Sequence, residues 1–173
     1  MTLKSDIEAG LALLPEALRT IDAKVQLYAT SIQENPTRAP RQLIKKDGKL
    51  QPIGPAAGDY QFEKTGGIRG LLNFKSDRLQ SMLRSVCTAR QVPQIVDGLF
   101  DAIQRDPILA AALARLLYFT DAGALPKAGA EQYAWDVYLR TWRPGAYERD
   151  PKGLRAKWSK SYAEAMKAYD LDS

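Results

Sequence analysis

The sequence contains no histidine and only one cysteine, Cys87. Without histidine, Ser-His-Asp catalysis, Cys-His catalysis and the common zinc sites are excluded. A single cysteine also excludes an internal disulfide, and its apolar neighbours Met82, Leu83 and Val86 predict a thiol buried in a helix face. Aspartate and glutamate therefore remain as the acid and base groups that this chain can offer.

Long apolar runs are absent as well. No stretch approaches the roughly 20 residues that a membrane span needs, so no membrane span is expected. The N-terminal segment MTLKSDIEAG carries acidic residues where a signal peptide needs its apolar region. The sequence therefore predicts synthesis in the cytoplasm without a secretion signal.

The composition is that of one globular domain, expected to span residues 1–173. Hydrophobic residues make up 45% of the chain, which is enough for a core of its own. Lys and Arg outnumber Asp and Glu by 25 to 20, a formal charge of +5 that favours polyanionic partners. A DNA-associated protein is one alternative, but nucleic acid is not the expected partner, because the sequence shows no helix-turn-helix pattern and no basic patch interleaved with aromatic residues.

Apolar periodicity predicts helices over most of the sequence. The first covers residues 4–18 and is divided at Pro15, and the second runs from Thr20 to about Glu34. Further helices are predicted from Ser76, from Pro93 and from Pro107, then over residues 130–142 and 152–169.

Residues 36–75 form a different kind of segment, rich in proline and glycine and without helical period. Asp47-Gly48 suits the type I′ turn of a β-hairpin over residues 42–53, and a short strand is expected over residues 58–62. The fold class is therefore mainly α (α+β), a helical body with a small β-hairpin lobe.

Glu34 is the strongest candidate for acid–base chemistry. It stands at the C-terminal end of an apolar-striped helix, directly before the proline-containing lobe. A carboxyl at the mouth of a cleft, partly desolvated by apolar walls, has its charged form disfavoured and stays protonated near neutral pH. The partial negative charge of the helix C-terminus acts in the same direction. A general acid for a glycosidic oxygen must have this property.

Four segments carry a resemblance to a known family. They are LYATSIQE (Leu27 to Glu34), GPAAGDYQFE (Gly54 to Glu63), LLYFTD (Leu116 to Asp121) and AWDVYLRTWRPG (Ala134 to Gly145). Together they resemble the lysozyme-like domains of lytic transglycosylases, particularly the small divergent versions encoded by tailed phages and prophages. Each segment is short, and the combination spans about residues 20 to 169. The resemblance implies a lysozyme-like fold with a cleft between the helical body and the lobe.

The resemblance also implies an activity, the cleavage of MurNAc–GlcNAc bonds in peptidoglycan by a transglycosylase or muramidase. Glu34 matches the catalytic glutamate, and Gln61 matches a strand residue that lines the cleft near the scissile sugar. In this family one carboxyl protonates the glycosidic oxygen and then, as base, helps the muramoyl 6-hydroxyl to close an anhydro ring. Neither a metal nor a cofactor is expected. The other residues expected to contact the substrate are Tyr60, Phe62, Tyr138, Trp142 and Arg143.

A phage particle is the implied carrier, with the chain as a tail or internal virion protein that acts in the periplasm or cell wall beside other virion proteins. Asn35 stands where the family has serine, and Thr141 to Gly145 stands where many transglycosylases have Asn-Ala-Gly. These departures leave a second function open, a structural virion protein that keeps the lysozyme-like fold without catalysis.

Three further features have two interpretations each. Asp59 and Glu63 could supply the second carboxylate of a hydrolase, or could be solvated or ion-paired. The helical side shared by Trp135, Tyr138 and Trp142 could stack sugar rings or belong to the core. The glycines from 66 to 70 lack the Lys-Ser/Thr of a phosphate loop, which favours a flexible cleft rim or connector.

Overall fold

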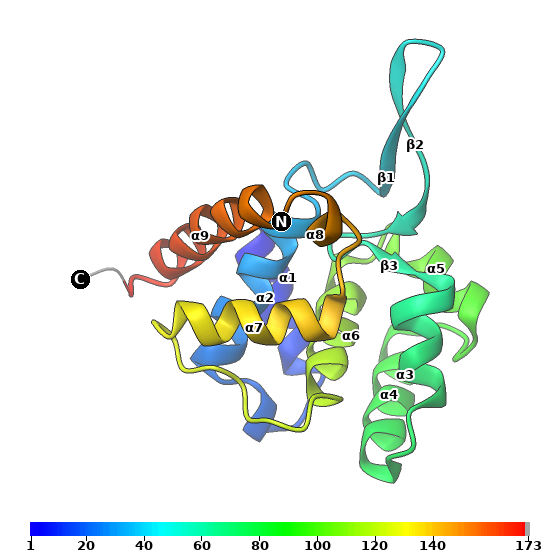
Figure 1. The fold of residues 1–173 in the computed structure, drawn as a ribbon. Helices are drawn as coiled ribbons and strands as arrows, with labels where there is room; N and C mark the ends of the chain where they lie inside the picture. Colours follow the sequence, from blue (N-terminus) through cyan, green and yellow to red (C-terminus); the bar gives the residue numbers. More distant parts are fainter. Residues whose placement is uncertain (172–173) are drawn as a thin grey trace.

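Helices make up most of the structure, a computed structural model that describes residues 1–171 (Figure 1). The α-helices are α1 (Leu3–Ala12), α2 (Ile21–Glu34), α3 (Arg69–Asn73), α4 (Asp77–Arg90), α5 (Val96–Ile103), α6 (Pro107–Phe119), α7 (Glu131–Trp142), α8 (Ala146–Arg149) and α9 (Pro151–Ala168). A short 3₁₀-helix, η1 (Glu16–Leu18), follows α1, and one π-helical turn, η2 (Lys64–Ile68), precedes α3. The small sheet has the antiparallel order β1 (Arg41–Lys46), β2 (Lys49–Ala57), β3 (Phe62–Glu63). The predicted mainly helical α+β class is confirmed.

Side-chain caps fix several helix starts at the predicted residues. The side chains of Thr20, Ser76 and Asp106 each accept a hydrogen bond from a backbone N–H in the first turn of α2, α4 and α6. The predicted start at Pro93 is wrong, because α5 begins at Val96. A Cβ on Gly98 would lie 2.9 Å from the Pro93 carbonyl oxygen, so the segment before α5 runs beside its first turn.

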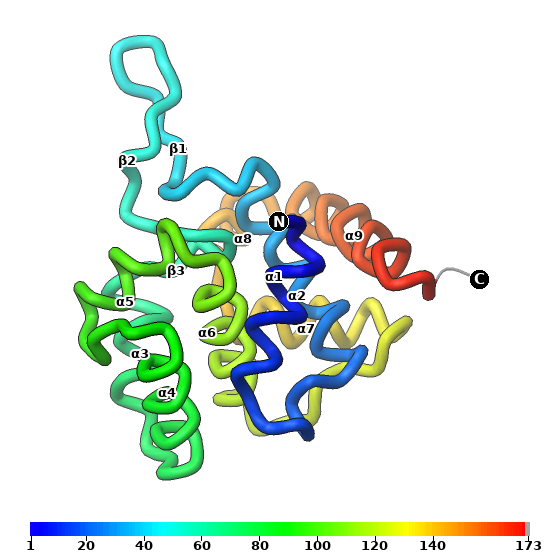
Figure 2. Tube along the Cα trace, turned by 180° about the vertical axis from the view of Figure 1, so that it is seen from behind, coloured from blue at the N-terminus to red at the C-terminus, as the bar shows by residue number. Residues whose placement is uncertain are grey.

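The β1–β2 hairpin projects from the helical body in both views (Figures 1 and 2). Asp47 and Gly48 connect its strands with φ values of 51° and 76°, both in the left-handed region that a type I′ turn requires. The hairpin predicted from this dipeptide is therefore confirmed.

The segment after β2 differs from its prediction. Gly58 has φ of 72° and Gln61 has φ of 50°, so residues 58–61 form a turn and only Phe62–Glu63 is strand. The prediction of a strand over residues 58–62 is therefore wrong, because the left-handed backbone at Gly58 and Gln61 reverses the direction of the chain. The helical turns η2 and α3 were also not predicted, since three glycines within residues 64–73 hide any helical pattern.

Helix α6 runs through the centre of the larger core cluster, the central core, and nine of its residues are buried. It packs against helices α1 to α5. Gly10 of α1 permits the closest approach, because a Cβ there would lie 2.6 Å from the Ile108 carbonyl oxygen. Cys87 is buried in the central core, where burial raises the pKa of its thiol. This agrees with the expected packing role.

A second cluster, the aromatic core, joins α2, α7 and α9. Its buried members are Val25, Ala29, Ala134, Trp135, Tyr138, Trp158, Tyr162, Ala165 and Tyr169. Among residues 1–171, no helix has the length and apolar character required to cross a membrane.

Candidate active site

A cleft of about 1230 Å³ separates the C-terminal end of α2 from the sheet and from the α7–α8 segment. Glu34 lines it together with Gln61 and Phe62 of the turn and strand after β2, and with Trp142 and Arg143 at the end of α7. The structure thus brings the predicted acid and four of the expected substrate contacts to one cavity.

Glu34 is the last residue of α2 and is partly buried in the cleft wall. The hydroxyl of Tyr138 donates a hydrogen bond to its Oε1 over 2.5 Å. Tyr138 reaches this carboxylate from α7, where its ring stacks on Trp158 with centroids 4.7 Å apart. The aromatic core therefore fixes the donor that orients Glu34.

Burial is the main influence on the acidity of Glu34. Desolvation raises the pKa of its carboxyl from 4.5 to about 7, and the hydrogen bond from Tyr138 and the charge of Lys157 oppose this rise. The charge of Glu63 acts in the same direction as burial. Near neutral pH the Glu34 carboxyl is thus divided between its protonated and charged forms.

The pKa values of the two groups beside this carboxyl, Tyr138 and Lys157, shift in opposite directions. Burial, followed by the charge of Glu34, raises the pKa of the Tyr138 phenol, so this hydroxyl stays protonated and acts as a donor. Burial lowers the pKa of Lys157, whose ammonium donates a hydrogen bond to the carbonyl oxygen of Gln33. A fixed donor and a nearby cation are therefore both available to a Glu34 carboxylate.

Asn35 connects the α2 end of the cleft with the turn on the other side. Its buried side-chain amide donates to the carbonyl oxygens of Ala39, at 2.8 Å, and Gly58, at 3.1 Å. Its Oδ1 accepts from the Ala39 backbone and the Thr37 hydroxyl. Asn35 thus has a structural role, because it joins the end of α2 to the turn that carries Gln61.

An ion-pair triad with two buried carboxylates holds the same turn to the body. Arg38 Nη2 lies 2.6 Å from Oδ2 of Asp6 in α1 and 2.6 Å from Oδ2 of Asp59. Both carboxylates are nearly inaccessible to solvent. Asp59 is therefore ion-paired away from the cleft lining, whereas Glu63 lines the cleft and is exposed. Of the two candidate second carboxylates, Glu63 is the one placed to face a ligand.

The turn presents its residues unequally to the cleft. Gln61 lines the cleft, and its amide nitrogen donates to the Gly58 carbonyl oxygen over 3.0 Å. Phe62 lines it with a buried ring. Tyr60, expected as a substrate contact, is fully buried behind the cleft, where its ring packs against both Phe62 and Trp142. It therefore does not line the cavity.

The α7 wall combines one fixed aromatic ring with exposed charge. Trp142 is half-buried, and its indole N–H donates to the Tyr60 carbonyl oxygen over 3.0 Å. Arg143 is exposed in left-handed backbone at the end of the helix. Trp135 and Tyr138, which were predicted to share a helical side with Trp142, are buried in the aromatic core and are not among the residues that line this cleft.

The remaining rim comes from the glycine-rich segment. Gly66, Gly67 and Gly70 line the cleft as the connector or rim expected from the sequence. Gly67 has no room for a larger side chain, because a Cβ would lie 2.6 Å from the Phe62 ring. This close contact sets the position of the rim against the strand.

Three contributors were not identified from the sequence: Lys157, the Arg140–Asp121 pair that lines the cleft, and the contact of Tyr138 with Glu34. Tyr138 is 104 positions from Glu34, so only the tertiary fold could reveal that contact. Within residues 1–171, no group of three or more Cys, Asp or Glu side chains could hold a metal ion.

Comparisons with protein-family models, with curated proteins and with solved structures found no match to this chain.

Proposed function

We propose that this chain is a lytic transglycosylase or muramidase with a lysozyme-like fold, and that it cleaves MurNAc–GlcNAc bonds in peptidoglycan with Glu34 as the acid. One observation carries the proposal. The Glu34 carboxyl lies partly buried in the wall of a large cleft, accepts a hydrogen bond from the Tyr138 hydroxyl, and has its pKa raised to about 7. The four-segment resemblance supplies the substrate class.

In the first step, the protonated Glu34 carboxyl donates its proton to the glycosidic oxygen as the bond from that oxygen to the anomeric carbon breaks. The departing sugar leaves as an alcohol, the anomeric carbon takes on the positive charge of an oxocarbenium-like species, and Glu34 becomes a carboxylate. The Tyr138 hydroxyl already donates to this carboxylate, and the Lys157 charge favours it. Both contacts therefore stabilise the form of Glu34 produced in this step.

In the second step, the Glu34 carboxylate accepts a proton from the nucleophile that attacks the anomeric carbon. With the muramoyl 6-hydroxyl as nucleophile, the product is an anhydro ring and the enzyme is a transglycosylase. With water as nucleophile, the product is a reducing end and the enzyme is a muramidase. Glu63 is exposed on the cleft wall, and its carboxylate would orient the water in a hydrolytic reaction.

The size and lining of the cleft suit an extended saccharide. Its volume of about 1230 Å³ exceeds the range of roughly 300–1000 Å³ that is typical of small-molecule pockets. Phe62 and Trp142 provide aromatic surface, while Gln61 and Arg143 provide polar donors. A glycan strand presents both apolar ring faces and polar edges, which this combination would bind.

A phage particle is the proposed route of the protein to the cell wall, as a tail or internal virion component beside other virion proteins. This part rests on the resemblance alone. A structural virion protein without catalysis remains the competing function, and it predicts binding to peptidoglycan with no change in the glycan.

Digestion of purified sacculi followed by mass spectrometry tests the proposal. The wild type, Glu34→Gln and Glu63→Gln are compared under the same conditions. Anhydromuropeptides that require Glu34 but not Glu63 would identify a transglycosylase, and reducing-end products that require both would identify a muramidase. Absence of products with the wild type, despite sedimentation with the sacculi, would refute catalysis and support the structural alternative.

A further inference from the structure

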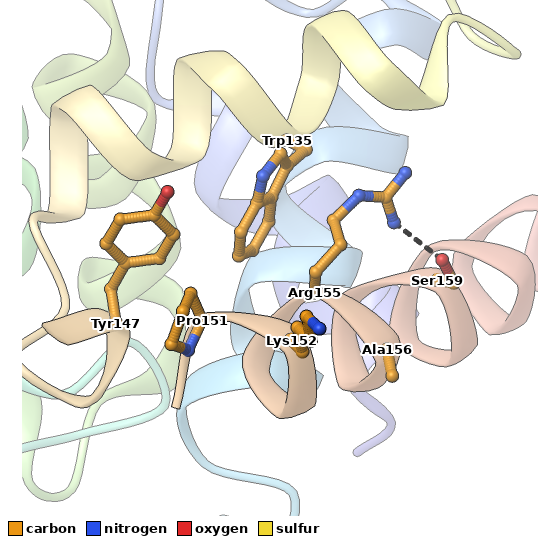
Figure 3. Close-up of a pocket in the computed structure, with 7 residues that line it drawn as sticks. All are labelled: Trp135, Tyr147, Pro151, Lys152, Arg155, Ala156 and Ser159. Atoms are coloured by element: carbon orange, nitrogen blue, oxygen red, sulfur yellow. Dashed lines mark hydrogen bonds between the residues drawn. The ribbon is translucent and has the colours of Figure 1, made fainter. Parts of the chain in front are cut away.

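A second hollow, of about 560 Å³, lies beside the first turns of α9 (Figure 3). Its lining includes Trp135 of α7, Tyr147 of α8, and Pro151, Lys152 and Arg155 of α9. None of these residues lines the cleft that contains Glu34.

Helix α8 is the wall shared by the hollow and the cleft. Ala146 and Arg149 line the cleft, whereas Tyr147 between them lines the hollow. The helix is a single turn of four residues, so the two cavities are close neighbours. A polymer that leaves the cleft over α8 therefore meets the hollow next.

The aromatic side of the hollow is exposed and well supported. Tyr147 is 42% exposed, and its ring centroid lies 6.2 Å from that of Trp135 (Figure 3). Trp135 is held in turn by Tyr138 and Trp158 of the aromatic core. Exposed aromatic rings with fixed support bind the apolar faces of sugar rings at little cost in conformational entropy.

The charged side of the hollow is basic. Lys152 and Arg155 line it, and its lining includes no acidic residue. Arg155 is engaged with Glu131 and Ser159, at 2.7 and 2.6 Å, and lies over the Trp135 ring. Lys152 is exposed and forms no hydrogen bond or ion pair within residues 1–171. Its ammonium is thus available to an anionic ligand.

We propose that this hollow is an accessory subsite for an acidic saccharide, occupied by a stretch of the same glycan strand whose neighbouring units lie in the cleft. A sugar ring rests on Tyr147, and a carboxylate attached to the strand lies beside Lys152. This inference rests on the proposed function, because that function identifies the strand as peptidoglycan, whose peptide stems carry carboxylates.

Equilibrium binding of soluble, uncross-linked peptidoglycan strands tests the subsite. All proteins carry Glu34→Gln, so that cleavage does not interfere, and chitin oligosaccharides of equal length serve as the uncharged ligand. Adding Tyr147→Ala should weaken binding of both ligands about tenfold, the effect of losing one well-formed contact. Adding Lys152→Ala should weaken binding of the peptidoglycan strands alone. Tyr147→Phe and Lys160→Ala are the matched controls and should leave both affinities unchanged.

The subsite is overturned if Tyr147→Ala and Lys152→Ala bind both ligands as tightly as the parent protein, or if the parent protein binds no strands. Its failure is separable from that of the proposed function, because this assay measures binding and the sacculus digestion measures products. If the two variants bind the strands more weakly but the wild type yields no glycan products, the subsite proposal is supported and the proposed catalysis is refuted.

Discussion

The raised pKa of Glu34 predicts a specific dependence of stability on pH. The folded chain holds this proton up to about pH 7, whereas the unfolded chain releases it near pH 4.5. For a carboxyl with a raised folded-state pKa, the stability contribution is fully present below pH 4.5. It decreases as the pH rises from 4.5 to about 7 and is lost above that window.

The size of this effect follows from the shift. Each pKa unit corresponds to about 1.4 kcal/mol, so a rise from 4.5 to about 7 lowers the free energy of unfolding by about 3 kcal/mol at pH 8. Glu34→Gln removes the cost, since the amide is neutral and its oxygen still accepts from Tyr138. The variant should match the wild type near pH 4 and exceed it by about 3 kcal/mol at pH 8. For a domain of this size, that difference is roughly 6–12 °C in Tm.

Urea unfolding and thermal melting of both proteins from pH 4 to pH 8.5 measure this gap. Glu148→Gln, which removes an exposed carboxylate from α8, is the matched control for loss of one negative charge. The assay needs no substrate, so it tests the environment of Glu34 independently of catalysis. Parallel curves for wild type and Glu34→Gln across the range would show that the carboxyl is well hydrated and would refute the argument for a poised acid.

Three further predictions concern the surroundings of this carboxyl and the turn opposite it. Tyr138→Phe removes a hydrogen bond that lowers the pKa of Glu34, so the alkaline limit of activity should move to higher pH. The same variant should have a free energy of unfolding about 1–3 kcal/mol lower than the wild type. In pH–rate profiles, Lys157→Met should move that limit to higher pH and Glu63→Gln should move it to lower pH. Arg38→Met leaves two buried carboxylates unpaired and should reduce the free energy of unfolding by about 3–5 kcal/mol in urea titrations.

Local signals in the sequence were sufficient for much of the fold. The helix starts at Thr20, Ser76 and Asp106 follow from side chains that cap the next few backbone N–H groups, and such contacts depend on near neighbours only. The hairpin around Asp47-Gly48 depends on two adjacent residues with positive φ. These features were predictable because the residues that determine them are adjacent in sequence.

Features set by distant contacts were not predictable in the same way. The turn over residues 58–61 depends on Gly58 packing against Ile103 and on the hydrogen bond that the Asn35 side-chain amide donates to the Gly58 carbonyl oxygen. The segment itself reveals neither contact. Glu34 could be selected from its place at a helix end, but its partners Tyr138 and Lys157 come from α7 and α9. The sequence can therefore point to a candidate carboxyl, whereas the groups that adjust its pKa are found only in the folded structure.

Trp142 belongs to three parts of the molecule at once. Its ring packs against both the central core and the aromatic core, and it also lines the cleft, where its N–H bonds to the turn. A repacking substitution in either core would shift this ring and, through it, the wall that faces Glu34. Changes in thermal stability and changes in ligand affinity should therefore be correlated among variants around this tryptophan. Selection for one of these properties would also change the other.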